Sequence, residues 1–272
     1  MNAFPPSRVG AFFDIDGTLI AKPSLEWRFF ASLIRRGAIP KQNYLHWLAQ
    51  ALRVAPQGLS AMRHANKMYL RGISHLELLT ESKNGCAPMA TRSFLPNGLQ
   101  QLTWHAQRGH QIVLVTGTLE PLAQEIVQAL TTLLAIREID ASVALCATVL
   151  EERNGRWTGR VDSAPMFGRA KASAIRNLAH ELHLDLSRSY AYADSFTDRE
   201  MLESVAYPAA VNPSPRLRQL ARERHWQILS WPAKSNPSRF AEAEPQACSS
   251  GQLFRPKALP QHEHFSASEK IR

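Results

Sequence analysis

Residues Phe12–Leu19, with the sequence FFDIDGTL, decide how the chain is interpreted. Residues 9–13 are apolar or small, which is typical of a buried parallel strand, and two aspartates follow where that strand must end. Ligands of open α/β sheets bind at this end of the strands, and two neighbouring carboxylates repel each other unless a cation lies between them. Asp14 and Asp16 therefore predict a metal site, with an ordinary acidic turn as the alternative.

Length and composition favour a globular protein with a large core and an anionic partner. The chain has 272 residues, of which 44% are hydrophobic, and a formal net charge of +9. Its three cysteines are scattered, which disfavours a disulfide framework and favours a reducing, cytoplasmic compartment; they are Cys86, Cys146 and Cys248. The sequence opens without the pattern of a signal peptide and has no run of about 18 apolar residues, so we expect a soluble protein.

A second predicted strand, at residues 111–115, is followed by Thr116 and Gly117 and then by a helix near Pro121. A hydroxyl group and backbone N–H groups before a helix amino terminus can bind phosphate. The same residues can equally form a plain loop between strand and helix. This segment is therefore a candidate phosphate site.

Charged residues accompany two later elements. Lys171 lies in the first turn of a predicted helix, where it either projects into water or meets an anion; Arg169 is its alternative. Asp194 and Asp198 follow a predicted strand at residues 189–193. Their spacing lets both reach one cation, and oxygen ligands favour Mg²⁺; for Asp198 the alternative role is a helix cap.

Residues 21–92 are predicted to form a helical insert. Two sets of apolar residues at helical spacing are expected to pack as core between helices: Leu25, Phe29, Phe30, Leu33 and Ile34, then Tyr44, Trp47, Leu48, Ala51 and Leu52. Ser74 and Glu77 form a capping box for a further helix. Residues 21–95 carry eleven Lys and Arg against three Glu, so nearly all the net charge lies here. This basic face is either simply solvated or attracts a phosphorylated substrate or an anionic membrane surface.

The pattern around the insert is that of an α/β core. It includes a helix at residues 97–108, a hairpin signal at Asn154-Gly155 and a last strand at residues 207–211. We therefore expect a core formed by residues 1–20 and 93–232, a helical cap at residues 21–92, and a disordered tail at residues 233–272, where Pro, Ser, Gln and Glu dominate.

The order of these motifs, Asp-x-Asp-Gly-Thr, Val-Thr-Gly-Thr, Lys171 and Asp-Ser-x-x-Asp, resembles that of the haloacid dehalogenase (HAD) superfamily of phosphohydrolases. It is most similar to subfamily IB, the phosphoserine-phosphatase-like branch, and the resemblance runs from about Val9 to Trp231. It implies a Rossmann-like core with a parallel sheet flanked by helices, and an all-helical cap inserted after the first strand. It also implies a Mg²⁺-dependent phosphomonoester hydrolase that acts on a small phosphorylated metabolite.

The resemblance further implies roles for individual residues. Asp14 is the expected nucleophile, which forms an aspartyl-phosphate, and Asp16 is the expected general acid and base. The expected phosphate-binding groups are Thr116, the Gly117 amide and Lys171. The expected ligands of Mg²⁺ are Asp14, the backbone carbonyl of Asp16, Asp194 and Asp198.

Two features depart from the family pattern and bear on the substrate. The family often has Gly-Gly or Ala-Ser after the hydroxyl residue, where this chain has Gly117-Thr118. Phosphoserine phosphatases carry a cap glutamate where this chain has Pro23, and Glu26 is the nearest acid, so a more anionic or an interfacial phosphomonoester is expected instead of phosphoserine.

Two other functions remain open on the sequence. One is a lipid phosphatase of the phosphatidylglycerophosphatase type, whose basic cap rests on a membrane surface. The other is a non-catalytic protein of the same fold that binds an anionic partner. Nucleic acid is not an expected partner, and the sequence does not determine the oligomeric state.

Overall fold

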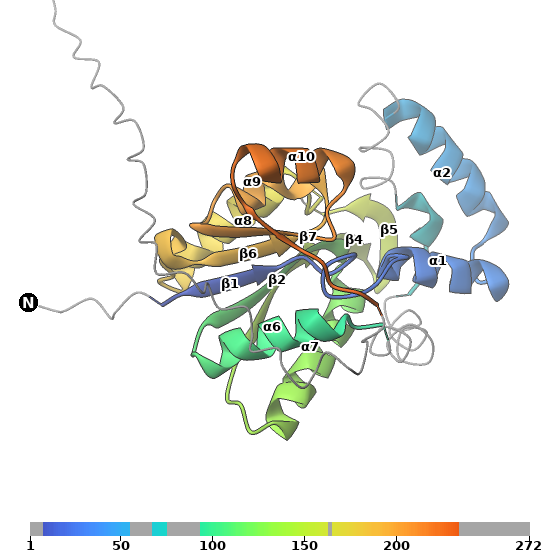
Figure 1. Ribbon diagram of the computed structural model, residues 1–272. Helices are drawn as coiled ribbons and strands as arrows, with labels where there is room; N and C mark the ends of the chain where they lie inside the picture. Colours follow the sequence, from blue (N-terminus) through green and yellow to red (C-terminus); the bar gives the residue numbers. More distant parts are fainter. Residues whose placement is uncertain (1–7, 55–66, 75–92, 163–164, 234–272) are drawn as a thin grey trace, which may run out of the picture.

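In the computed structural model, residues 8–54, 67–74, 93–162 and 165–233 are described, and they form a parallel sheet between two layers of helices (Figure 1). The sheet has six strands in the order β3-β2-β1-β6-β7-β8, and every neighbouring pair is parallel. The strands are β1 (Gly10–Phe13), β2 (Gln111–Leu119), β3 (Val143–Thr148), β6 (Tyr190–Ala193), β7 (Tyr207–Val211) and β8 (Gln227–Leu229). All four residues of β1 are buried, as the apolar run predicts for a central strand.

Helices cover both faces of the sheet (Figure 1). Phe13 shares a buried cluster with residues of α6 and α7, whereas Phe12 shares one with residues of α8, α9 and α10. Successive residues of a strand point to opposite faces, so this pair of phenylalanines anchors both layers. The helices are α6 (Pro96–Gln107), α7 (Glu120–Ile136), α8 (Arg169–Glu181), α9 (Arg199–Leu202) and α10 (Pro215–Glu223), with short 3₁₀ turns η4 (Leu186–Arg188) and η5 (Phe196–Asp198). The predicted fold class is confirmed.

The insert leaves the sheet directly after β1. It contains α1 (Leu25–Arg35), α2 (Lys41–Val54) and the 3₁₀ turn η2 (Met68–Leu70). Its two ends lie side by side, because Ala21 N–H donates to the Ser93 carbonyl at 2.9 Å and Leu95 N–H donates to the Leu19 carbonyl at 2.8 Å. The insertion of helices after the first strand is thus confirmed. The domain limits at 1–20, 21–92 and 93–232 stay a prediction, and the helix expected at Ser74 and the tail at 233–272 lie almost wholly outside the described residues.

A hairpin joins the insert to the core. It consists of β4 (Leu150–Arg153) and β5 (Arg156–Val161), which are antiparallel, and the turn residues Asn154 and Gly155 both have positive φ, as the sequence predicts. Trp157 is buried in one cluster with residues of α1 and η2, and its carbonyl accepts a hydrogen bond from the Gly72 amide at 2.8 Å. The hairpin therefore holds the insert against the rest of the molecule.

Two local expectations were wrong. The second strand, β2, does not end at residue 115 but continues through Thr116 and Gly117 to Leu119. It continues because its partner β3 extends to Thr148, with a shift in register between Val115 and Leu119. Most of the second apolar set does not form core: on α2, Leu48 and Leu52 are 53% and 69% exposed, and Ala51 alone of the set is buried. In the first set, Leu25, Phe29 and Leu33 are buried as predicted, whereas Ile34 is exposed.

None of the helices in the described part of the chain combines the length and the apolar character that a membrane span requires.

Candidate active site

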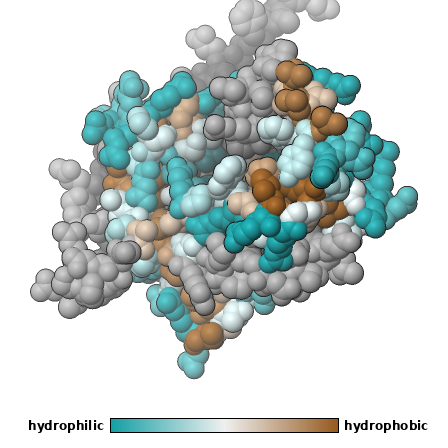
Figure 2. Space-filling view, turned by 90° about the vertical axis from the view of Figure 1, so that its right-hand side faces the viewer, coloured by the Kyte–Doolittle hydropathy of each residue, from teal (hydrophilic) through white to brown (hydrophobic). Residues whose placement is uncertain are grey.

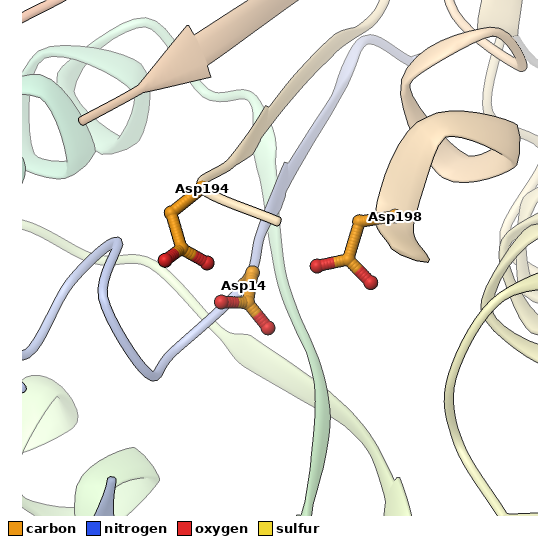
Figure 3. A group of neighbouring side chains, drawn as sticks. All are labelled: Asp14, Asp194 and Asp198. Atoms are coloured by element: carbon orange, nitrogen blue, oxygen red, sulfur yellow. The ribbon is translucent and has the colours of Figure 1, made fainter. Parts of the chain in front are cut away.

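Three aspartates from two neighbouring strand ends meet at the carboxyl edge of the sheet (Figure 3). Asp14 follows β1, Asp194 follows β6, and Asp198 ends η5. All three are buried, and one carboxylate oxygen from each lies within 4.8 Å of the others. The sequence predicted these residues as metal ligands, and the structure brings their carboxylates together; the ligand role itself stays a prediction.

The backbone after β1 sets this geometry. Asp14 N–H donates to the Tyr192 carbonyl of β6 at 3.0 Å, so the two strands end at the same level. Gly17 has a φ of 90°, and a Cβ atom there would lie 2.4 Å from Oδ2 of Asp194. The chain can therefore pass this carboxylate only with glycine at position 17.

Lys171 joins the group from the first turn of α8. Its Nζ lies 2.6 Å from Oδ1 of Asp14 and 3.0 Å from Oδ1 of Asp198. Burial opposes the charge of Lys171, but the two carboxylates outweigh that effect and hold its pKa above the usual range. Arg169 is exposed, so the choice that the sequence left open is resolved in favour of Lys171.

Lys22 also reaches the site, which sequence reasoning missed. Its Nζ lies 2.7 Å from Oδ2 of Asp194, although its side chain is 69% exposed. In the sequence it resembles any solvated lysine of the basic insert, because its partner is far along the chain. Its position after the Asp-x-Asp-Gly-Thr motif was the one available signal.

Asp16 is not one of the three grouped aspartates, and its carboxylate is held by two donors. Leu25 N–H donates to its Oδ1 at 2.8 Å, and the Thr118 hydroxyl donates to its Oδ2 at 2.5 Å. Burial raises the pKa of Asp16 to about 6, the charges of Asp14 and Glu26 add to that rise, and the two hydrogen bonds oppose it. This carboxyl group can therefore carry a proton more readily than an ordinary aspartate.

The predicted phosphate-binding residues line the same cavity. Its volume is about 460 Å³. Thr116 and Gly117 enter it from β2 and not from a helix amino terminus, since α7 begins only at Glu120. The seven predicted site residues all line this cavity: Asp14, Asp16, Thr116, Gly117, Lys171, Asp194 and Asp198.

The carboxylates suit a hard cation. Burial raises the pKa of Asp198 to about 7 and also raises the pKa of Asp194, and in both cases the Asp14 charge adds to the rise while lysine opposes it. The nearby lysines therefore do not fully offset the negative charge of these three buried carboxylates. Their oxygens are the ligands that Mg²⁺ and Ca²⁺ prefer, so the residues fit a divalent metal.

Comparison with known proteins identifies the family of this chain. The model of the haloacid dehalogenase-like hydrolase family matches residues 11–203. The chain belongs to this family. Over 231 residues this hydrolase is 30% identical to a probable phosphatase of Mycobacterium tuberculosis. The matched stretch covers 84% of this chain and 77% of the relative. Over 225 residues it is 32% identical to phosphoserine phosphatase SerB1 of the same organism, covering 80% of the chain and 69% of the relative.

Solved structures share the fold of this chain. A Bordetella pertussis Tohama I protein of unknown function superposes with a TM-score of 0.64 at 27% identity, covering 82% of this chain and 98% of that one. A substrate-bound phosphoserine phosphatase superposes with a TM-score of 0.53 at 15% identity, covering 83% and 94%, and this likeness concerns the fold alone. The predicted family and the predicted enzyme class, a phosphatase of the HAD type, are therefore confirmed.

Proposed function

We propose that this protein is a Mg²⁺-dependent phosphomonoester hydrolase that acts through an aspartyl-phosphate on Asp14 and takes a small phosphorylated metabolite. The observation that carries the proposal is the meeting of Asp14 and Lys171 with two further buried aspartates in one cavity. Asp16 lines the same cavity and can carry a proton. A non-catalytic protein would have no use for this combination of groups.

In the first step, a carboxylate oxygen of Asp14 attacks the phosphorus atom and the bond from phosphorus to the ester oxygen breaks. Protonated Asp16 gives its proton to the departing oxygen, so an alcohol is released and Asp16 becomes ionised. The Thr116 hydroxyl, the Gly117 N–H and the Lys171 ammonium group hold the phosphoryl oxygens. Their positive charge and dipoles offset the negative charge of the transition state.

In the second step, ionised Asp16 takes a proton from a water molecule as that water attacks the phosphorus of the aspartyl-phosphate. The bond between phosphorus and Asp14 breaks, inorganic phosphate is released, and both aspartates return to their starting states. A single carboxyl group thus acts as acid and then as base. Its raised pKa, about 6, suits both tasks near neutral pH.

The ligands proposed for the metal are Asp14, the Asp16 backbone carbonyl, Asp194 and Asp198. When bound there, Mg²⁺ supplies positive charge that the carboxylates and the phosphoryl oxygens share. Lys22 and Lys171 contact the same carboxylates and contribute to this balance.

The part of the cavity that the insert contributes bears on the substrate. Glu26 lines it, and its Oε1 accepts hydrogen bonds from the Lys67 ammonium group and from the Tyr69 hydroxyl at 3.0 Å. Burial and the Glu26 charge raise the pKa of Tyr69 well above its usual range, so this hydroxyl stays protonated. Because Lys67 offsets the charge of Glu26, we favour a metabolite without an ammonium group at this end over phosphoserine.

Metal removal tests the proposal directly. Protein treated with EDTA should not hydrolyse p-nitrophenyl phosphate, and added Mg²⁺ should restore the rate. Asp194→Asn should raise the Mg²⁺ concentration needed for half-maximal activity by roughly 10- to 100-fold or more. Loss of a residue that only supports a metal ligand already weakens metal affinity by that factor. Equal rates with and without EDTA would refute the metal requirement.

Asp16→Asn should separate substrates by their leaving groups. Alkyl phosphates need a proton on the departing oxygen, so their kcat/KM should fall by about 10²- to 10⁴-fold. The leaving group of p-nitrophenyl phosphate is stable as an anion. For this substrate the rate of aspartyl-phosphate formation should therefore fall far less. The control is Asp140→Asn, which removes one exposed carboxylate outside the site. Equal losses for both substrates would contradict the role of Asp16 as an acid.

A further inference from the structure

The helix α2 packs with Asn43 and Ala51 inward. Asn43 is only 2% exposed, and its Nδ2 donates to the carbonyls of Tyr69 and Arg71 at 3.1 Å and 2.7 Å. On the opposite side, Leu45, Leu48 and Leu52 are 71%, 53% and 69% exposed. Their spacing of three and four residues places them on one face of the helix. We call this face, formed by Leu45, Leu48 and Leu52, the α2 leucine stripe.

Exposed apolar residues concentrate on this part of the molecule. In the part of the chain that the structure describes, eleven large apolar side chains are exposed, and seven of them belong to α1 and α2. They are Trp27, Ile34, Tyr44, Leu45, Trp47, Leu48 and Leu52. Single exposed apolar residues are common on protein surfaces, whereas such a concentration marks a contact site. Figure 2 views the molecule from the cap side, where hydrophobic and hydrophilic residues lie next to each other.

The charges around the stripe identify its partner. Arg35 and Arg36 at the end of α1, Lys41 at the start of α2 and Arg53 at its end are all exposed. Residues 27–54 contain no Asp or Glu. A second copy of the same face would bring these positive charges together, which opposes self-association. A lipid surface with anionic headgroups complements both the leucines and the basic residues.

We propose that the α2 leucine stripe docks on an anionic lipid surface, with the helix lying in the interface. The leucines enter the acyl region, the basic residues contact headgroups, and the rings of Tyr44 and Trp47 lie between the two zones, where such amphipathic rings are enriched. The insert also supplies Ser24 and Glu26 to the catalytic cavity, so docking holds that cavity next to the lipid surface. The inference does not depend on the proposed chemistry.

Vesicle sedimentation with the full chain tests the proposal. At low salt, the partition coefficient onto vesicles containing one third phosphatidylglycerol should exceed that onto pure phosphatidylcholine by about a hundredfold or more, since each basic residue near the surface contributes. High salt should reduce this difference. The combined variant Leu45→Ser, Leu48→Ser, Leu52→Ser should bind the anionic vesicles at least about tenfold more weakly. Its control is Ile136→Ser, which removes one apolar side chain, more exposed than any of the three leucines, from α7 and should bind as wild type does.

Activity and oligomeric state distinguish docking on lipid from misfolding of the variant and from self-association. Hydrolysis of the soluble substrate p-nitrophenyl phosphate should be unchanged in the triple variant, which shows that it is folded and keeps the site. Failure of the wild type to bind anionic vesicles at low salt overturns the proposal, as does equal binding by wild type and triple variant. A wild-type dimer that the triple variant converts to monomer, without vesicle binding by either, also overturns it, because a second copy then covers the stripe.

Discussion

Asp14→Asn is expected to lower kcat for p-nitrophenyl phosphate by about four orders of magnitude or more. The amide retains the size of the side chain but is not a nucleophile, and it gives Lys171 no negative partner at position 14. Lys171 keeps its ion pair with Asp198 at 3.0 Å, so the site loses its chemistry without losing its packing. Initial rates at saturating substrate and Mg²⁺ measure the effect.

Asp140→Asn is the matched control for this variant. It makes the same chemical change at an exposed position, so its kcat should equal that of wild type. Thermal unfolding of both variants should remain cooperative, which separates lost chemistry from lost structure. Wild-type turnover by Asp14→Asn would remove the basis of the nucleophile assignment.

Gly17→Ala is expected to damage both the site and the stability of the protein. The new Cβ atom would lie 2.4 Å from Oδ2 and 2.7 Å from Cγ of Asp194, a buried side chain with little room to move. The backbone at position 17 also has a φ of 90°, which strains any residue with a side chain. We expect a loss of about 1–3 kcal/mol in the free energy of unfolding and a fall of about a hundredfold in kcat, because the carboxylates no longer meet at their native distances.

Gly109→Ala separates these two causes. Gly109 also has a positive φ, 69°, but no atom lies within 4 Å of the Cβ that alanine would add. This control variant should lose stability through backbone strain and keep full activity. If Gly17→Ala keeps wild-type kcat, or if the two variants lose the same activity, the close passage of the chain by Asp194 does not position the site.

The positions of the site residues were largely predictable from the sequence because each follows a recognisable element. Asp14 and Asp194 directly follow short apolar runs that are typical of buried strands, and Thr116 follows such a run within β2. Parallel strands bring their carboxyl ends to one edge. The order of the motifs along the chain then indicated the family. What the sequence could not give is which of two neighbouring cations turns inward, since Arg169 and Lys171 both lie in the first turn of α8.

The face that α2 buries could not be predicted for a related reason. Helical periodicity shows that apolar residues share a face, but it does not show what that face contacts. The decisive partners of Asn43 are carbonyls at residues 69 and 71, beyond the end of the helix and outside its pattern. The contact between Lys22 and Asp194 could not be predicted either, because the two residues lie far apart in the sequence.

The central claim is that phosphate passes through a covalent bond to Asp14, and trapping that bond tests it most directly. In Asp16→Asn, p-nitrophenyl phosphate should still transfer its phosphoryl group, while attack by water is slowed because no base is present. Acid quenching after mixing with radiolabelled p-nitrophenyl phosphate and Mg²⁺, followed by peptide mapping, should place the label on Asp14. Nitrophenol release with the label on another residue, or on none, would contradict the account.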